Sequence, residues 1–238
     1  MTLTRYGWKE WGLGGVAALG LLAGAWGLWQ CGWHGCAGAL AALTLLAYFC
    51  LAAFFRNPRR AVPADPLLIL SPADGVVRDV GEVADFKQAP FDGAARRIGI
   101  FLSVFNVHVN RAPADWQVLS KQYRPGRHLD ARDANCAQEN EAMTLGGTAS
   151  AGGLTFPLAV RQISGAIARR IVCPVEPGRA LSRGRVYGMI KFGSRTELYL
   201  PVDARIEIAV APGDKVKAGV TVLARVIPEE AGGTHHAE

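Results

Sequence analysis

Two histidines of the sequence, His108 and His128, stand in settings where an imidazole could carry out proton chemistry. The other three lie in an apolar N-terminal stretch or among the last residues of the chain. An imidazole titrates at about pH 6.5, so it is the side chain best suited to exchange protons near neutral pH. His108 lies in an apolar, strand-like run, where a purely structural role is the alternative. His128 lies in a polar segment rich in Gly and Arg, where we expect it to be solvated.

Asp74 and Ser194 are two further residues with reactive groups in suggestive surroundings. Asp74 follows Pro-Ala and precedes Gly, which is ordinary turn chemistry because Asp accepts local backbone hydrogen bonds and Gly tolerates positive φ. Ser194 lies in Gly-Ser-Arg between two strand-like runs, which fits a tight hairpin turn. Each of these segments alone therefore predicts a turn.

These residues are distributed over residues 63–228, a segment with the pattern of a mostly β domain. Short β-branched or aromatic runs bounded by Gly, Pro and Asp are typical of strands. The expected strands are 75–80, 97–103, 116–124, 185–192, 196–200, 204–210 and 221–227. We expect a long loop over 125–153, a short helix within 165–172 and a flexible tail over 229–238.

The N-terminal part of the chain has the composition of a membrane anchor. Residues 11–55 are 45 consecutive residues without Asp, Glu, Lys or Arg. About 20 apolar residues cross a hydrocarbon core of ~30 Å, so this stretch fits two crossings joined by a turn. We predict a transmembrane helical hairpin with spans Gly12–Trp29 and Cys36–Phe55, within an anchor of residues 1–60 that precedes a catalytic domain of residues 61–228.

Basic residues flanking this hairpin predict its orientation. Arg5 and Lys9 precede the first span and Arg56, Arg59 and Arg60 follow the second, whereas the turn carries none. The positive-inside rule then places both ends in the cytoplasm at the inner membrane, so the following β domain is expected to be cytoplasmic. A cleavable signal peptide is the alternative, but its apolar region would span only about 7 to 15 residues.

Composition and charge exclude several other classes of protein. Half of the 238 residues are apolar and 19% are charged, which fits a packed domain with a membrane segment rather than a disordered or collagen-like chain. The net charge of +6 includes no basic stripe interleaved with aromatics, so we expect anionic lipid and no nucleic acid as partner. The five cysteines suggest neither a disulfide framework nor a complete metal site, so we expect no metal.

Three short motifs in combination resemble the phosphatidylserine decarboxylase family in its short form. They are Pro-Ala-Asp-Gly at 72–75, Asn-Val-His-Val-Asn-Arg at 106–111 and Lys-Phe-Gly-Ser-Arg at 191–195, all behind a membrane anchor. Phe-Phe-Arg-Asn-Pro-Arg-Arg at 54–60 and Ile-Ala-Arg-Arg-Ile-Val-Cys at 167–173 extend the resemblance over essentially the whole soluble domain. Each motif is weak evidence alone, but their order and spacing are specific.

The resemblance implies a cofactor that the chain makes from itself. Members of the family cut their own backbone before a serine, here Ser194, and convert it to a covalent pyruvoyl group. His108, oriented by Asp74, would be the base that activates the serine hydroxyl, as in a serine-histidine-aspartate triad. The hydroxyl would then attack the carbonyl of Gly193, which has no Cβ to shield it.

The implied reaction is the decarboxylation of phosphatidylserine to phosphatidylethanolamine and CO2. The substrate amine would form a Schiff base with the pyruvoyl ketone, and the conjugated carbonyl would accept the electrons freed as CO2 departs. His108 would also protonate the product carbanion. The two cleaved pieces, 1–193 and 194–238, would stay together as a heterodimer that acts on a phospholipid of the membrane.

Two positions depart from the family's pattern. Longer members carry a second histidine where this chain has Phe105, so His108 would serve in both stages. Relatives commonly have an arginine where this chain has Ala142, so another cation is expected to contact the anionic headgroup. The sequence does not choose among three basic residues for this role: Arg111, Arg124 and Lys191.

Two other functions fit parts of the same sequence. The run 204–226 resembles the lipoyl-like β-sandwich of lipoyl and biotinyl carriers, so the chain could be a membrane-anchored carrier or adaptor without catalysis. Lys215, near a turn of this run, lacks the flanking residues of a modifiable lysine. A membrane serine hydrolase would instead use Ser194 as a turnover nucleophile and leave the chain uncut.

Overall fold

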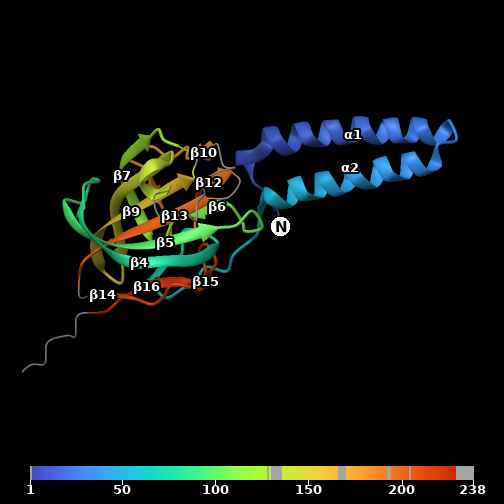
Figure 1. Ribbon diagram of the computed structural model, residues 1–238. Coiled ribbons are helices and arrows are strands. Elements are labelled where there is room, and N and C mark those ends of the chain that lie inside the picture. The colour runs from blue at the N-terminus through green and yellow to red at the C-terminus, as the bar shows by residue number, and fades with distance from the viewer. Residues whose placement is uncertain are drawn as a thin grey trace, which may run out of the picture. The chain divides into compact units, whose positions relative to one another are not determined.

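The chain folds into two compact units, Met1–Arg59 and Arg60–Glu238. The first unit contains the helical pair, and the second is mostly β sheet (Figure 1). This architecture comes from a computed structural model, which describes residues 2–127, 129, 136–165, 170–191, 194–203 and 205–228. The predicted fold class is confirmed in this coarse form: a mostly β domain behind two apolar helices. The tail expected over 229–238 lies outside the described residues.

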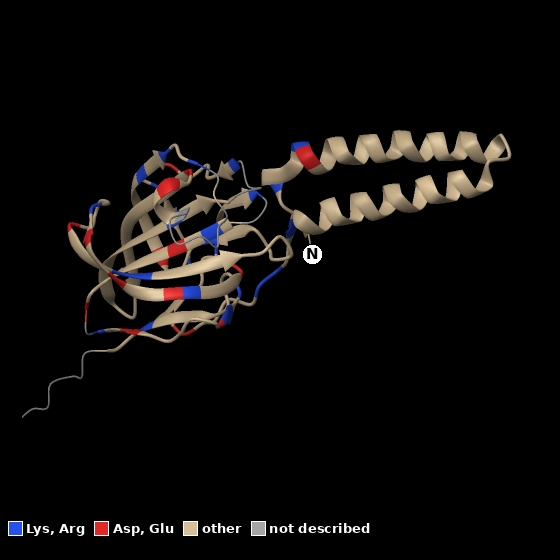
Figure 2. Cartoon of the chain, viewed as in Figure 1, with Lys and Arg blue, Asp and Glu red and all other residues tan. Residues whose placement is uncertain are grey.

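Two long apolar helices dominate the N-terminal unit. Helix α1 spans Trp8–Gln30 and helix α2 spans His34–Phe54, and both are long and apolar enough to cross a membrane. The 3-10 helix η1, Arg5–Gly7, precedes α1, and strand β1 (Thr2–Leu3) pairs with β2 (Arg56–Asn57). Figure 2 shows both long helices nearly free of charged residues, whereas the strands of the larger unit carry both signs.

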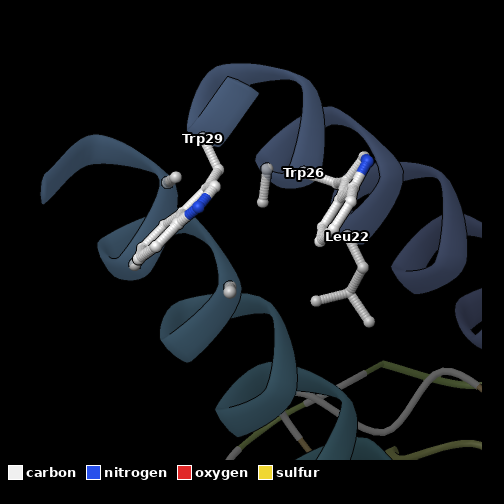
Figure 3. A pocket seen from close by; sticks show the side chains of 7 residues that line it. Leu22, Trp26 and Trp29 are labelled. Atoms are coloured by element: carbon white, nitrogen blue, oxygen red, sulfur yellow. The ribbon is translucent and has the colours of Figure 1, made fainter. Parts of the chain in front are cut away.

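An apolar recess of about 340 Å³ lies between the two helices (Figure 3). Leu22, Trp26 and Trp29 of α1 line one side. Small residues of α2, Ala37 and Gly38 among them, leave the space on the other side. The lining residues include no acid, base or nucleophile, so this recess does not suit the predicted chemistry.

An eight-stranded sheet forms the larger unit, in the order β11-β7-β8-β9-β13-β5-β4-β15. All of its neighbouring strands are antiparallel. In that order the strands are Ala180–Leu181, Asp115–Arg124, Ala142–Ala151, Leu154–Ser164, Ser194–Pro201, Gly93–Leu102, Gly75–Phe86 and Lys215–Val216. Strand β13 lies between β9 and β5, in the middle of the sheet (Figure 1).

Two three-stranded sheets and a short helix complete this unit. The sheet β10-β12-β6 contains Arg170–Val172, Val186–Lys191 and Val109–Arg111. The sheet β14-β16-β3 contains Ile206–Ile208, Val222–Val226 and Leu68–Leu70, and helix α3 spans Cys136–Glu139. One hydrophobic core joins all three sheets, with Ile100, Tyr187 and Leu223 as members from each. This shared core fixes the strands that carry the three motifs relative to one another.

The long loop expected over 125–153 is wrong, because ten of its residues form β8 in the large sheet. Gly146 and Gly147 of this strand favoured a loop in the sequence. A Cβ at these positions would collide with the carbonyl oxygens of Ala89 and Gln117, so glycine allows a close backbone approach here.

The short helix expected within 165–172 is also wrong where the structure describes it. Residues 170–172 form strand β10, which pairs with β12, while residues 166–169 lie outside the described part of the chain. Pairing to a neighbouring strand decided the conformation of this segment, because local helix preference is weak against tertiary contacts.

Candidate active site

Ser194 is the first residue of β13 and lies in the centre of the large sheet. Its backbone pairs with Leu102 of β5 on one side and with Ser164 of β9 on the other. The side chain is fully buried, and among the described residues its Oγ has no hydrogen-bond partner. Such buried, unsatisfied polar atoms are rare in folded proteins, and a catalytic role is one of the few reasons for them. Gly193, its neighbour at the predicted cleavage site, lies outside the described residues.

His108 is fully buried and immediately precedes β6. Its backbone carbonyl accepts a hydrogen bond from the N–H of Ile190 in β12 over 3.2 Å. Its ring nitrogen Nδ1 lies 2.9 Å from the carbonyl oxygen of Asn106. A carbonyl oxygen can only accept, so Nδ1 donates and the neutral ring has Nε2 as its basic nitrogen. The backbone of Asn106 therefore selects the tautomer that a general base requires. His128, the other histidine considered above, lies outside the described residues.

Asn110, in the second sequence motif, has a fully buried side-chain amide that contacts the first motif and the residue that follows the third. Its Nδ2 donates to the carbonyl oxygen of Pro72 over 3.3 Å and to Oγ1 of Thr196 over 3.2 Å. Its Oδ1 accepts from Nε2 of Gln162 over 2.8 Å. One amide therefore links the turn after β3, the strand β6, and the two central strands β9 and β13.

Two residues that flank Ser194 in the sequence, Gly188 and Thr196, are both partners of Asn110. Gly188 of β12 is the backbone partner of Asn110, and Thr196 of β13 is its side-chain partner. The segment 188–196 therefore contacts Asn110 at both of its ends, and Ser194 lies within it. Within the same segment, the N–H of Ile190 donates to the backbone carbonyl of His108.

Asp74 has a largely buried carboxylate at the turn between β3 and β4, with its side chain 10% exposed. Its Oδ2 accepts from Nη2 of Arg60 over 2.7 Å, and its Oδ1 accepts from the N–H of Ala218 over 2.8 Å. The sequence suggested that this carboxylate orients His108. In the structure the contact at Nδ1 of His108 comes from Asn106, and Asp74 is engaged by Arg60.

The turn that carries Asp74 is packed closely against two strands. The carbonyl oxygen of Pro72 accepts from the N–H of Arg111 in β6 over 3.0 Å. A Cβ at Gly75 would collide with the carbonyl oxygen of Phe101 in β5, so only glycine permits this approach. Asp74 and Gly75 therefore form the turn and also contribute to the candidate site.

Arg111 adds a second cation beside the same acid. Burial lowers the pKa of Arg111, the positive charge of Arg60 lowers it further, and Asp74 raises it. Nη1 of Arg111 donates to the carbonyl oxygen of Gly184 over 3.0 Å. Two cations around one carboxylate leave a net positive charge next to the turn, which suits an anionic headgroup.

The other two cations considered for the headgroup have different surroundings. Nη2 of Arg124 donates to the carbonyl oxygens of Ala137 and Asn140, over 2.8 and 3.0 Å, and so holds the backbone near α3. Lys191 is buried at the end of β12, three residues before Ser194. Of the three, Lys191 is the nearest to Ser194 along the chain and Arg111 is the one beside Asp74.

The opposite face of β13 is fixed by a buried ion network. Arg195 donates to Oε1 of Glu197 over 2.9 Å and to Oδ2 of Asp79 over 2.6 Å, and the Tyr199 hydroxyl donates to Oε2 of Glu197 over 2.6 Å. Burial lowers the pKa of Arg195, but the two carboxylates outweigh it and the net shift is upward. Because side chains alternate along a strand, this network keeps Ser194 on the other face.

Sequence reasoning missed several residues that build the site, namely Asn106, Asn110, Gln162 and Arg60. Asn110 stands two residues after His108 in an apolar strand, and this alternation of polar groups was the available signal. Arg60 belongs to a motif that carried the family resemblance, but its partner could not be identified. Among the described residues no group of three or more His, Cys, Asp or Glu side chains could hold a metal ion.

Comparison with known proteins shows the family to which the chain belongs. Residues 47–224 match the family model described as phosphatidylserine decarboxylase. A phosphatidylserine decarboxylase proenzyme of Carboxydothermus hydrogenoformans is 42% identical over 222 residues, which cover 92% of this chain and 93% of the relative. Proteins with the same name from Rhodopirellula baltica and Citrifermentans bemidjiense are 48% and 42% identical, covering 72% and 89% of this chain and 70% and 91% of the relatives. The chain belongs to the phosphatidylserine decarboxylase family.

Proposed function

We propose that this chain is the proenzyme of a phosphatidylserine decarboxylase and cleaves itself between Gly193 and Ser194. Its relatives bear that name and align with most of the chain. The observation that carries the proposal is the buried Oγ of Ser194, which has no partner among the described residues and lies on a segment bonded to the backbone of His108.

Self-cleavage begins with transfer of the Ser194 hydroxyl proton to Nε2 of His108, the basic nitrogen of the tautomer that Asn106 selects. The alkoxide attacks the carbonyl carbon of Gly193, and the peptide nitrogen of Ser194 leaves with a proton as the bond becomes an ester. β-Elimination then releases the carboxylate of Gly193 and leaves a dehydroalanine. Tautomerisation and hydrolysis release ammonia and give the pyruvoyl group at residue 194.

The position of residue 194 fits a pyruvoyl group. That group supplies a ketone for the substrate amine and a conjugated carbonyl that accepts the electrons released with CO2. Residue 194 is buried between β5 and β9, so these strands shield it from water. His108 is the proton source for the product carbon, because its imidazole can return the proton that it accepts.

Asp74 belongs to this site in our proposal, although its bonds define a role different from that in a simple triad. Its carboxylate holds the guanidinium of Arg60 and the backbone of Ala218 against the turn. The pairing of Asp74 with Arg60 therefore keeps the turn in place while Ser194 is activated.

The two cleaved pieces remain one folded unit. Strand β13 begins at the cut and pairs with β5 and β9 of the N-terminal piece along most of its length. Strands β15 and β16 of the C-terminal piece also pair with β4 and β3. Because strands of the two pieces pair within the same sheets, chains 1–193 and 194–238 form a heterodimer. The likeness of 204–226 to lipoyl-type carriers stays a prediction.

The helical pair anchors the enzyme beside its lipid substrate. Both helices meet the length and apolarity of a membrane span. The basic residues at both ends of the pair favour a catalytic unit on the cytoplasmic face of the inner membrane. Tethering raises the local substrate concentration, because a diacyl lipid stays in the bilayer.

Comparison of Ser194→Ala with the unmodified chain tests this function. We expect the unmodified chain to run as two pieces on a denaturing gel and to release CO2 from phosphatidylserine in vesicles. Ser194→Ala should stay as one chain and release none, while Ser182→Ala, at an exposed turn, should behave as the unmodified protein. Activity in uncut Ser194→Ala would contradict the mechanism, and fluorophosphonate labelling of an uncut native chain would favour the serine hydrolase.

A further inference from the structure

Gln162 of β9 has a buried hydrogen-bond acceptor that the fold does not use. The residue is 1% exposed, and its Nε2 donates to Oδ1 of Asn110 over 2.8 Å. Its Oε1 has no hydrogen-bond partner among the described residues. A buried polar group without a partner costs free energy, so it points to a role other than stability. No step of the proposed self-cleavage uses this acceptor.

The orientation of the Gln162 amide is fixed by a chain of hydrogen bonds that begins at a backbone carbonyl. The carbonyl oxygen of Pro72 can only accept, so Asn110 presents Nδ2 to it and leaves Oδ1 for Gln162. Because Oδ1 also can only accept, Gln162 presents Nε2 to it. The group that Gln162 leaves unpaired is therefore an acceptor rather than a donor.

Strand register places Gln162 on the same face of the large sheet as Ser194. Gln162 lies opposite Thr196, and Ser164 lies opposite Ser194. Opposite residues share a face of the sheet, and so do residues two apart along a strand. Gln162 and Ser194 are thus diagonal neighbours, which lie about 7 to 8 Å apart and within reach of a long side chain.

Glycine in the facing strand leaves the Gln162 amide uncovered from that side. A Cβ at Gly188 of β12 would lie 3.0 Å from Nε2 and 3.6 Å from Oε1 of Gln162. The same Cβ would lie 2.7 Å from the carbonyl oxygen of Val172, so the backbone packing also requires glycine here. No side chain from this position therefore covers the free acceptor.

We propose that Oε1 of Gln162 accepts a hydrogen bond from the substrate amine at residue 194. This inference rests on the proposed function, in which that amine reacts with a ketone at residue 194. An amine carries N–H donors, so an acceptor beside the ketone recognises it and holds its nitrogen near the carbonyl carbon. The bond to Asn110 fixes the acceptor before the substrate arrives, which reduces the ordering that binding requires.

The test separates the capture of an amine at residue 194 from the reactivity of the ketone itself. Full-length, self-cleaved protein is incubated with dissolved dibutyryl phosphatidylethanolamine and cyanoborohydride, and mass spectrometry follows the piece 194–238. Condensation of the amine loses one water and reduction adds two hydrogens, so a stable secondary amine accumulates. The rate of this trapping is divided by the rate at which borohydride alone adds two hydrogens to the ketone.

Two substitutions of Gln162 distinguish its acceptor from its structural bond. Gln162→Met and Gln162→Glu both lose the amide that donates to Asn110, but only Gln162→Glu keeps an acceptor. Because Oε1 takes no part in self-cleavage, both variants should still yield cleaved chain. Gln162→Met should lower the ratio of the two rates about tenfold, the effect of one hydrogen bond. Gln162→Glu should keep most of the ratio.

Gln88→Met is the matched control for loss of a buried glutamine. Gln88 is also buried with an Oε1 that has no described partner, but it lies in the turn between β4 and β5, where its Nε2 donates to Oγ of Ser120 over 3.2 Å. This variant should leave the ratio unchanged, because its acceptor belongs to another part of the β unit.

Several outcomes would overturn the proposal. An unchanged ratio in Gln162→Met would mean that Oε1 meets only solvent. Equal losses in Gln162→Met and Gln162→Glu would assign the effect to the bond with Asn110, and absence of cleavage in both variants would assign Gln162 to maturation. If the unmodified protein formed no piece 194–238, or if borohydride added no hydrogens to that piece, the proposed function itself would fail.

Discussion

The side-chain amide of Asn110 donates a hydrogen bond to Oγ1 of Thr196 over 3.2 Å, and so joins the strand that follows His108 to the strand that begins with Ser194. Neither partner has a group that the chemistry consumes. Their contact nevertheless holds together two strands from different sheets, and the proposed mechanism requires these strands to stay close. Self-cleavage should therefore depend on residues that are not reactive.

Replacing Asn110 should slow maturation and destabilise the β unit. Asn110→Leu leaves two buried side-chain groups, Oγ1 of Thr196 and Nε2 of Gln162, without their partner, and each such loss costs about 1 to 3 kcal/mol. Thr196→Val removes one of these bonds and should cost about 1 kcal/mol. Thermal unfolding and the rate of cleavage on a gel measure both effects. Wild-type cleavage by Asn110→Leu would show that this amide does not position the site.

The pairing of Arg60 with Asp74 predicts that the two residues act as one unit. Arg60→Gln and Asp74→Asn should each slow self-cleavage, and the double variant should be no slower than the worse single variant, because coupled residues are not additive. Arg60→Lys should recover part of the rate. Arg59→Gln, an exposed neighbour, should cleave normally.

A direct action of Asp74 on His108 would give another pattern in the same experiment. Asp74→Asn would then be much slower than Arg60→Gln, and the loss of Arg60 would add to it. Additive losses, or a larger defect in Asp74→Asn alone, would restore the triad and contradict the Arg60 pairing as the main role of Asp74.

Removing the imidazole of His108 should stop maturation. His108→Ala should accumulate uncut chain, because it removes the imidazole whose Nε2 accepts the Ser194 proton in the proposed mechanism. Added imidazole should restore part of the cleavage by filling the vacated space. His34→Ala, at the start of α2, serves as the control. Complete cleavage of His108→Ala without added imidazole would assign the base to another group.

Burial raises the pKa of the Cys173 thiol from its usual value of about 9 to about 11. At pH 8 its thiolate fraction is therefore about a hundredfold lower than that of an ordinary cysteine, and alkylation should be slower by that factor in the folded protein than in denaturant. Because the folded state keeps this proton to higher pH than the unfolded state, stability falls as the pH rises from about 9 to about 11. Mass spectrometry of the alkylated peptide, and melts of Cys173→Ala, check both statements. Rapid folded-state labelling at pH 8 would contradict the burial.

The sequence predicted the elements whose local pattern is strong. Two apolar helices were evident from 45 uncharged residues, and the strand near 97–103 was evident from its branched and aromatic residues. Strand β8 was missed because Gly146 and Gly147, which favour loops locally, are required by close contacts with distant backbone. Tertiary contacts of this kind cannot be derived from a window of neighbouring residues.

The reactive residues of the site could be predicted from the sequence, but the residues that hold them in place could not. Ser194, His108 and Asp74 were identified by motif order and remain predictions in their catalytic roles. The pairing of Arg60 with Asp74 depends on how the chain returns after the helical pair, which no local pattern specifies. The carbonyl of Asn106 belongs to the backbone, and because every residue type carries such a carbonyl, the sequence does not single this one out.

Intact-mass analysis of the native full-length protein tests the central claim most directly. Self-cleavage at Ser194 predicts two components, residues 1–193 and the 45 residues 194–238, with the second lighter by one ammonia and gaining two hydrogens on borohydride reduction. A single component of full-length mass from protein that decarboxylates phosphatidylserine would contradict it.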